Sequence, residues 1–342
     1  MRHRAIAYAS LSALLFGAST PFAKLLVGAI SPLALAGLLY LGSGIGLAIW
    51  FAFRRAPLNL AMKDVSWLGG AIVAGGVIGP ALLMQGLART DGASASLLLN
   101  LEAVFTAVMA WVVFRENVDR RIFAGFVAIA AGGIVLSWDQ APRASGLAGP
   151  LLVAGACLAW ALDNNLTRRV SGGDAVAIAS LKGLVAGTVN LGLALALGAY
   201  LPAPGAVLLG ALVGLLGYGV SLVFFILALR ELGTARTSAY FAVAPFYGAG
   251  IALVLLDEQT GPAFWAAAAL MAIGVWLHLT ERHEHEHAHE ATTHAHEHVH
   301  DAHHQHEHPD GNATEPHSHT HHHRAIRHRH PHYPDLHHRH EH

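Results

Sequence analysis

The segment ASLLLNLEAVFTAVMAWVVFRE, residues 95–116, is an apolar run that carries one carboxylate, Glu102, near its middle. An apolar stretch of about twenty residues is long enough for an α-helix to cross about 30 Å of hydrocarbon. A carboxylate inside such a stretch is costly to place in lipid, so it usually faces a cavity. The segment therefore predicts a membrane span that contributes to a polar interior.

The rest of the chain up to about residue 280 has the same character. Charged residues make up 13% of the whole sequence, whereas soluble proteins have about a quarter. The first apolar run continues to Gly28, which is longer than the apolar part of a signal peptide and favours an uncleaved span. The sequence thus predicts an all-α integral membrane protein. Its ten candidate spans are residues 5–28, 32–53, 66–88, 91–113, 121–138, 147–167, 174–198, 205–228, 233–255 and 262–280.

Basic residues are distributed unevenly between the connecting segments. The N-terminus and the segments after spans 2, 4, 6 and 8 carry two or three Lys or Arg each, whereas the other connecting segments carry one or none. Loops rich in Lys and Arg stay in the cytoplasm. The pattern predicts a multi-pass protein with both termini, and the tail after the last span, on the cytoplasmic side.

The opening segment recurs in altered form as TSAYFAVAPFYGAGIALVLLDE at residues 237–258. In the same order, ALLFGASTPFAKLLV (13–27) matches ACLAWALDNNLTRRV (156–170). Each copy would hold five spans, an odd number, so the two copies would cross the membrane in opposite directions. Inverted repeats are typical of secondary transporters, whose substrate site lies between the halves. The predicted parts are a first five-helix repeat at 1–142, a second at 143–282, and a tail at 283–342.

The segment SASLLLNLEAVFTAVMAWVVFRE (94–116) and its counterpart in span 9 resemble the signature of the EamA family in the drug/metabolite transporter superfamily. The resemblance covers residues 5–280. It implies a ten-helix carrier of the bacterial inner membrane that exports small metabolites through a cavity lined chiefly by spans 1, 3, 4, 6, 8 and 9. Where the family usually has proline after the Glu of span 4, this chain has Ala103, while the second copy keeps Pro245. We therefore expect a proline kink in one half only.

Polar residues inside the spans are the candidates for a transport site. Glu102 is predicted to bind a proton or a cation, the alternatives being a structural ion pair or a protonated carboxyl group. In span 6, Asp163 and Thr167 share a helix face, while Asn164 and Asn165 point elsewhere, so one asparagine should bond to a neighbouring helix.

Two lysines lie within predicted spans. Lys182 is expected either to pair with Asp163 or Glu102 or to extend to the cytoplasmic face, and Lys24 to extend to the outer interface. Gln85 and the tyrosines either line the cavity or pack between helices. The predicted transport cavity comprises Lys24, Gln85, Asn100, Glu102, Asp163, Asn164, Thr167, Lys182, Tyr218 and Tyr240.

The tail differs in composition from everything before it. Of the 26 histidines, all but His3 and His278 follow residue 282, where they alternate with Glu, Ala, Asp and Thr. Because the tail lacks apolar periodicity, we predict that it is disordered. Imidazoles at this density suit Ni²⁺, Co²⁺ or Zn²⁺, and the H-E-x-x-H matches within it are expected by chance. The predicted ligands are His283, His285, His287, His289, His294, His296, His298, His300, His303, His304, His306 and His308.

Two functions are compatible with these features. The first is export of Ni²⁺, Co²⁺ or Zn²⁺ in exchange for protons, and the alternative is export of small, amino-acid-like metabolites by a carrier whose tail only buffers or senses metal. No enzyme activity is expected, because the spans show no nucleophile and base pair. The single Cys157 separately excludes an internal disulfide and a thiolate-rich metal site. No cofactor is expected to be required. The expected partners are the lipid bilayer and a small-molecule or metal-ion cargo, without nucleic acid, and the expected state is a monomer or homodimer.

Overall fold

The helices and the histidine-rich tail form two compact units, which are described separately. The computed structural model describes residues 2–54, 64–114, 120–140, 146–171, 173–280, 284–289, 292–298, 317–323 and 326–331.

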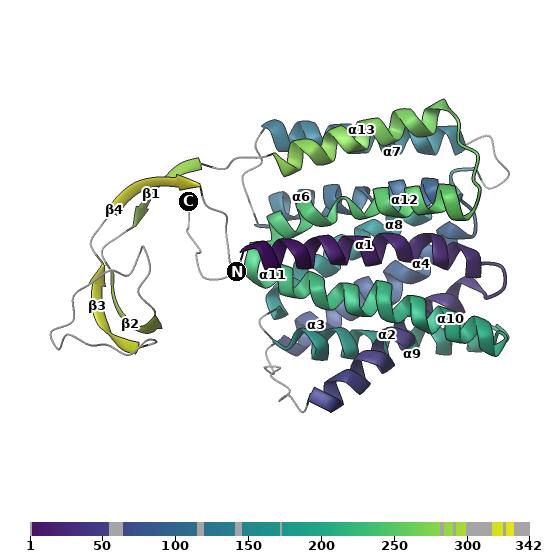
Figure 1. Cartoon of the computed structure of the whole chain (residues 1–342), viewed down its shortest axis with the longest axis horizontal. Coiled ribbons are helices and arrows are strands. Elements are labelled where there is room, and N and C mark those ends of the chain that lie inside the picture. Colours follow the sequence, from purple (N-terminus) through teal and green to yellow (C-terminus); the bar gives the residue numbers. More distant parts are fainter. Residues whose placement is uncertain are drawn as a thin grey trace. The chain divides into compact units, whose positions relative to one another are not determined.

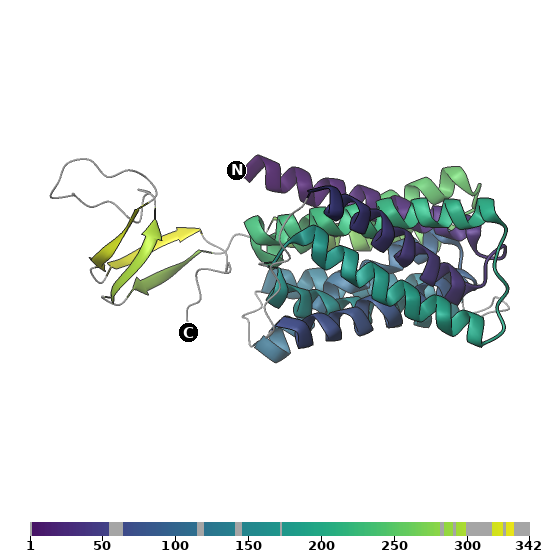
Figure 2. The ribbon, with the colours of Figure 1, turned by 90° about the horizontal axis from the view of Figure 1, so that it is seen from below.

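The helical unit is a bundle whose helices run side by side (Figures 1 and 2). Along one side of the bundle α2 packs against α9, and along another α7 packs against α13. The helices are α1 (Arg2–Leu26), α2 (Pro32–Arg54), α3 (Val65–Ala71), the π-helix η2 (Ile72–Ile78), α4 (Gly79–Leu87), α5 (Gly92–Leu98), α6 (Leu101–Phe114), α7 (Arg120–Gln140), α8 (Ala148–Val170), α9 (Ala175–Ala196), α10 (Pro204–Gly214), the π-helix η3 (Leu215–Val220), α11 (Ser221–Phe241), α12 (Ala244–Leu255) and α13 (Pro262–Leu279).

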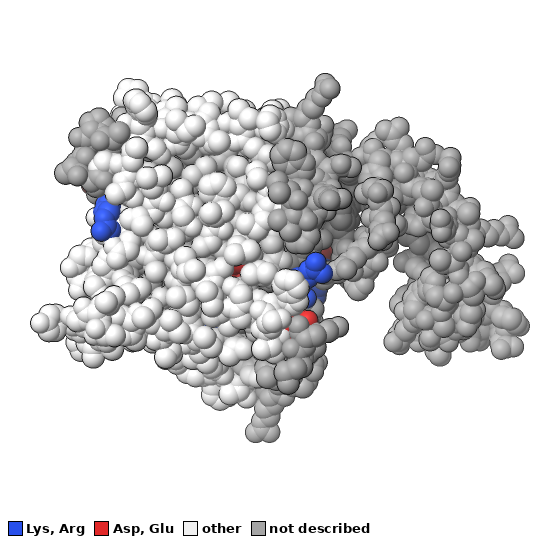
Figure 3. Space-filling view, turned by 180° about the vertical axis from the view of Figure 1, so that it is seen from behind, with Lys and Arg blue, Asp and Glu red and all other residues white. Residues whose placement is uncertain are grey.

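The surface of this unit suits a lipid environment. On the face shown in Figure 3, the part that the structure describes is almost free of Lys, Arg, Asp and Glu between its two ends. Large apolar side chains such as Phe53, Leu208 and Val254 are exposed, and broad apolar exposure of this kind marks contact with lipid or a partner. The chain is therefore a multi-pass membrane protein.

The helix lengths support several of the predicted spans. Among the described residues, six helical stretches are long and apolar enough to cross a membrane, and the apolar helices at Phe123–Trp138 and Ala244–Leu255 are shorter. The full set of ten spans in two inverted repeats stays a prediction. The six stretches are Arg4–Leu26, Pro32–Arg54, Val65–Leu87, Ala175–Ala196, Pro204–Leu232 and Pro262–Leu279.

Predicted spans 3 and 8 each contain a π-helical turn, at η2 and η3. In each turn a glycine takes the place where a side chain would collide with a neighbouring helix. A Cβ on Gly75 would overlap the carboxylate of Asp163, and a Cβ on Gly217 would overlap the side chain of Ser19. Only glycine permits so close an approach. The two turns therefore bring a polar side chain of another helix against the backbone at matching places in the two copies of the sequence pattern.

Both copies also contain a helix break, so the expectation of a kink in one half only is wrong. One break separates α5 from α6 at Leu99 and Asn100, and the other separates α11 from α12 at Ala242 and Val243. In the first break the Asn100 side chain donates to the carbonyl of Leu97 at 3.0 Å. An asparagine side chain competes with the helix for backbone partners, so the helix breaks at Asn100 although Ala103 stands where the family usually has proline.

The boundary predicted between spans 8 and 9 is also different in the structure. Residues 229–232, which separate the two predicted spans and include Arg230 and Glu231, lie inside α11 (Ser221–Phe241). Arg230, Glu231 and Leu232 all favour helix, and no proline interrupts the segment. The charged side chains of Arg230 and Glu231 therefore do not end the helix.

The tail contains strands where we predicted disorder. β1 (Glu284–His289) pairs with β4 (Ile326–Pro331), and β2 (Thr292–His298) pairs with β3 (His317–His323), both antiparallel. Main-chain hydrogen bonds between strands need no apolar side chains, and the alternation of histidine with other residues has the period of a strand. The disorder predicted for the tail as a whole stays a prediction, since the structure describes only these four segments of it.

Candidate transport site

A narrow pocket lies among the helices, on both sides of the α5–α6 break. Its described lining residues come from predicted spans 1, 4, 6, 8 and 9, with none from span 3. The lining residues are Phe16, Leu99, Asn100, Glu102, Ala103, Thr106, Asn164, Phe225, Phe241, Ala242 and Pro245.

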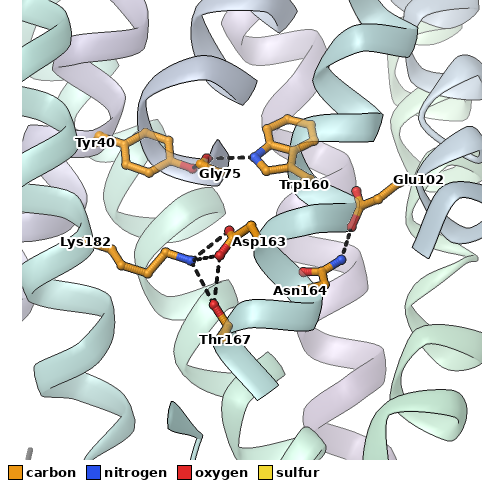
Figure 4. A network of polar contacts seen from close by, with 8 residues as sticks. All are labelled: Tyr40, Gly75, Glu102, Trp160, Asp163, Asn164, Thr167 and Lys182. Carbon is orange, nitrogen blue, oxygen red and sulfur yellow. Dashed lines mark hydrogen bonds and ion pairs between the residues drawn. The ribbon is translucent and has the colours of Figure 1, made fainter. Parts of the chain in front are cut away.

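Among the lining residues that the structure describes, Glu102 is the single ionisable one. Because the break ends at Asn100, Glu102 falls in the first turn of α6, where free backbone N–H groups and the helix dipole stabilise a negative charge. Asn164 of α8 donates from Nδ2 to Oε1 of Glu102 at 2.7 Å (Figure 4). The prediction that one of the asparagines of span 6 would bond to a neighbouring helix is confirmed, whereas Asn165 bonds to Ala161 of its own helix.

Two other lining residues each carry a side-chain oxygen atom that lacks a hydrogen-bond partner. Oδ1 of Asn100 and Oγ1 of Thr106 are buried and have no hydrogen-bond partner among the described residues. A buried acceptor without a partner costs free energy, about 1–3 kcal/mol. The amide oxygen of Asn100 only accepts and the Thr106 hydroxyl both accepts and donates, so these two lining residues add acceptor capacity to that of Glu102.

Aromatic rings also contribute to the wall of the pocket. The ring of Phe16 in α1 lies 5.3 Å from that of Phe241, 5.6 Å from Trp160 and 5.8 Å from Tyr218, measured between centroids. The Phe225 ring lies 5.0 Å from that of Phe241. Tyr218, predicted to line the cavity, instead packs behind Phe16 and is not among the lining residues.

Asp163, Thr167 and Lys182 form a separate polar cluster on another face of α8 (Figure 4). Nζ of Lys182 lies 2.6 Å from Oδ1 and 2.7 Å from Oδ2 of Asp163. The Thr167 hydroxyl donates to Oδ1 of Asp163 at 2.8 Å. Of the alternatives predicted for Lys182, the structure shows the ion pair with Asp163, and none of the three residues lines the pocket.

The π-turn η2 lies against this cluster. The carbonyl of Gly75 accepts hydrogen bonds from the Tyr40 hydroxyl at 2.8 Å and from Nε1 of Trp160 at 2.9 Å. Asn190 of α9 donates to the carbonyl of Gly76 at 3.1 Å. Side chains from α2, α8 and α9 therefore converge on two adjacent carbonyls of η2.

Three more residues predicted for the cavity lie elsewhere. Nζ of Lys24 donates to the carbonyls of Leu87, at the end of α4, and Thr90, in the turn after it, at 2.5 and 2.7 Å, and its extension to the outer interface stays a prediction. Gln85 on α4 accepts a hydrogen bond at 2.7 Å from Arg89, which follows the end of that helix. Tyr240 packs against the cluster of small and apolar residues that includes Ala5 and Ala9. None of the three lines the pocket.

Sequence reasoning missed two groups of residues. The phenylalanines of the pocket carried no signal, since aromatic residues are common in membrane spans. Glu258 accepts hydrogen bonds from the backbone N–H groups of Gly92 and Ala93 at 2.6 and 2.7 Å, which joins the segment after α12 to the start of α5. The acidic end shared by the two repeat copies was the available signal for Glu258.

The predicted metal ligands are divided between described and undescribed residues. His285, His287 and His289 lie in β1, and His294, His296 and His298 lie in β2. Within the described ranges, no group of three or more His, Cys, Asp or Glu is placed to hold a metal ion. The other predicted ligands, His283, His300, His303, His304, His306 and His308, lie outside the described residues.

A bundle of apolar helices that encloses a pocket with a buried carboxylate is an arrangement typical of membrane transporters. The EamA-like transporter family matches residues 3–138 and again 147–280, and the chain belongs to this family. An uncharacterized transporter of Methanothermobacter thermautotrophicus is 28% identical over 284 residues, which cover 77% of this chain and 82% of that protein. A solved structure described as "Crystal structure of protein" has a TM-score of 0.62 at 18% identity, covering 80% of this chain and 94% of that chain, and it supports the fold alone.

Proposed function

We propose that this transporter carries a small organic solute with an ammonium group, and that Glu102 binds that group in the pocket. The observation that carries the proposal is the combination of one carboxylate with spare acceptors on Asn100 and Thr106. A primary ammonium has three N–H donors and no acceptor. It therefore matches a pocket whose lining residues offer several acceptors.

The phenylalanines of the pocket support an organic cargo over an inorganic ion. Phe16, Phe225 and Phe241 offer apolar surface to the hydrocarbon part of a solute. Aromatic faces also attract a cation, by about 0.5–2 kcal/mol depending on its hydration. A hydrated metal ion gains nothing from such apolar surface.

Proton coupling follows from the use of one carboxylate for two ligands. Glu102 in the pocket binds either a proton or the ammonium group of the cargo, so arrival of one favours release of the other. If the two halves of the protein alternate in access, this competition drives export in exchange for protons.

Export of Ni²⁺, Co²⁺ or Zn²⁺ is the second candidate function, and the histidine-rich tail favours it. A tethered tail that binds metal raises the metal concentration near the helical unit. The pocket itself offers oxygen acceptors, whereas these metals prefer imidazole and thiolate ligands. We therefore place metal binding in the tail and organic cargo in the pocket.

Uptake into everted membrane vesicles tests the two candidates together. Amines and amino acids are assayed with the wild type, Glu102→Gln and a control, Glu231→Gln, which neutralises an exposed carboxylate on α11. We expect proton-driven uptake of at least one amine, a loss of about tenfold or more in Glu102→Gln, and no change in the control. Normal amine transport by Glu102→Gln would contradict the proposal.

Metal content is measured in cells that express the full chain, the chain ended after Arg282, or Glu102→Gln. A fall in cell Ni²⁺, Co²⁺ or Zn²⁺ that requires Glu102 would favour metal as the cargo. Unchanged metal content beside Glu102-dependent amine transport would favour the organic solute.

A further inference from the structure

Asp163 and Asn164 are neighbours on α8 whose side chains point in different directions. Asp163 points towards Lys182 on α9, and Asn164 points towards Glu102 on α6 (Figure 4). One residue along an α-helix corresponds to a rotation of about 100°. Whatever fixes the Asp163 side of α8 therefore also fixes where Asn164 reaches the pocket.

The Asp163 side of α8 is held by several bonds at once. Lys182 is 2% exposed and Asp163 7% exposed, so this ion pair is shielded from water. Lys182 also donates to Thr167 at 3.3 Å, one turn along the helix. One turn in the other direction, Trp160 bonds to the carbonyl of Gly75. Three successive turns of α8 are thus bound to η2 and α9.

The ion pair has little capacity to bind cargo. Both carboxylate oxygens of Asp163 already accept from Lys182, and Oδ1 also accepts from Thr167. The pair is also absent from the pocket lining. A ligand would have to separate two buried opposite charges, which is strongly unfavourable.

The geometry of the pocket depends on the rotation of α8. Turning a helix by 20° moves a side-chain tip that lies about 6 Å from the axis by roughly 2 Å. The 2.7 Å hydrogen bond between Asn164 and Glu102 would not survive such a shift. We propose that Asp163 and Lys182 are positioning residues, whose ion pair holds α8 in the rotation that places Asn164 against Glu102. This inference rests on the proposed role of Glu102 in the pocket.

Cysteine cross-linking measures this positioning without any transported solute. In a Cys157→Ala background, Glu102→Cys and Asn164→Cys replace the two pocket partners, and a short bifunctional thiol reagent joins them at a rate set by the orientation of α8. Lys182→Met is expected to slow cross-linking about tenfold, because it leaves the charge of Asp163 unpaired. The double change Asp163→Asn with Lys182→Met removes both charges and is expected to restore the rate.

Two controls and a transport assay complete the test. Arg54→Met breaks the partly exposed pair of Arg54 with Asp174 (3.6 Å) and is expected to leave the rate unchanged. In the native pocket, the Asp163→Asn and Lys182→Met double variant is expected to transport amines within about threefold of the wild type, while Lys182→Met alone loses about tenfold.

Equal cross-linking rates with and without Lys182→Met would overturn the proposal. A double variant that cross-links normally but fails to transport would also overturn it, because the pair would then act in transport itself. If the wild type carries no amine, only the proposed cargo fails, and the cross-linking rates still decide whether the pair positions α8.

Discussion

At the scale of single residues, the site depends on a few groups with no tolerance for added volume. Gly75 is the clearest example, because its missing side chain leaves room for the carboxylate of Asp163. Elsewhere in the same span, Gly69 has no atom within 4 Å of the place that a Cβ would take. Of these two glycines in one span, Gly69 has room for a larger side chain and Gly75 does not.

Replacing Gly75 with alanine should displace Asp163 and lower stability by about 1–3 kcal/mol. Gly69→Ala should be neutral or stabilising, by up to about 1 kcal/mol, since alanine favours helix over glycine. Thermal unfolding of the two purified variants in detergent checks this. A Gly75→Ala protein as stable as Gly69→Ala would show that Asp163 has room to move.

At the scale of elements, the turn between α4 and α5 is held from two sides. Lys24 of α1 donates to the carbonyls of Leu87 and Thr90, and Glu258 accepts from the N–H groups of Gly92 and Ala93. Asp257 takes a positive φ of 49° just before Glu258, a conformation that costs a non-glycine residue about 1 kcal/mol or more. The bonds of Glu258 offset this cost.

Glu258→Gln should therefore lower the free energy of unfolding by about 1 kcal/mol or more, since charge-assisted hydrogen bonds are about twice as strong as neutral ones. Asp257→Asn is the matched control, because asparagine tolerates a positive φ. Within the described part of the chain, Asp257 makes no hydrogen bond or ion pair. Equal unfolding temperatures for the two variants would argue against a stabilising role for Glu258.

Sequence patterns predicted some features of these helices and not others. Apolar run lengths predicted most helices, because the length needed to span a bilayer is a local property of the chain. The break at Asn100 was not predicted, since an asparagine breaks a helix only where its side chain turns back to the backbone. Likewise, Arg230 and Glu231 were taken to separate two spans because they are charged, although both residues favour helix and lie inside α11.

At the scale of the whole molecule, the transporter unit and the histidine-rich tail are separate units. The family match ends at residue 280, before the tail begins. The helical unit should therefore fold and insert without the tail. We expect the chain ended after Arg282 to reach the membrane in normal amount and to unfold at the same temperature as the full chain.

Metal binding by the tail should depend on pH in a defined direction. Imidazole binds metal only when neutral, and its unperturbed pKa is about 6.5. Affinity of the full chain for Ni²⁺ should therefore fall steeply between about pH 7 and pH 5. Calorimetric titration of the full chain and of the chain ended after Arg282 measures this, and equal Ni²⁺ binding by both would remove the tail as the metal site.

The sequence by itself determined that this protein is a helical membrane transporter with a carboxylate at membrane depth, because hydropathy, span length and the family signature are written along the chain. It left open whether Lys182 would pair with Asp163, pair with Glu102 or extend to the cytoplasmic face, and it placed Asp163, Lys24 and Tyr218 in one cavity. The tertiary structure alone decided that Asn164 meets Glu102, while Lys182 meets Asp163 on another side of α8. The physical reason is that partners on different helices depend on the rotation and packing of each helix, which no local pattern specifies.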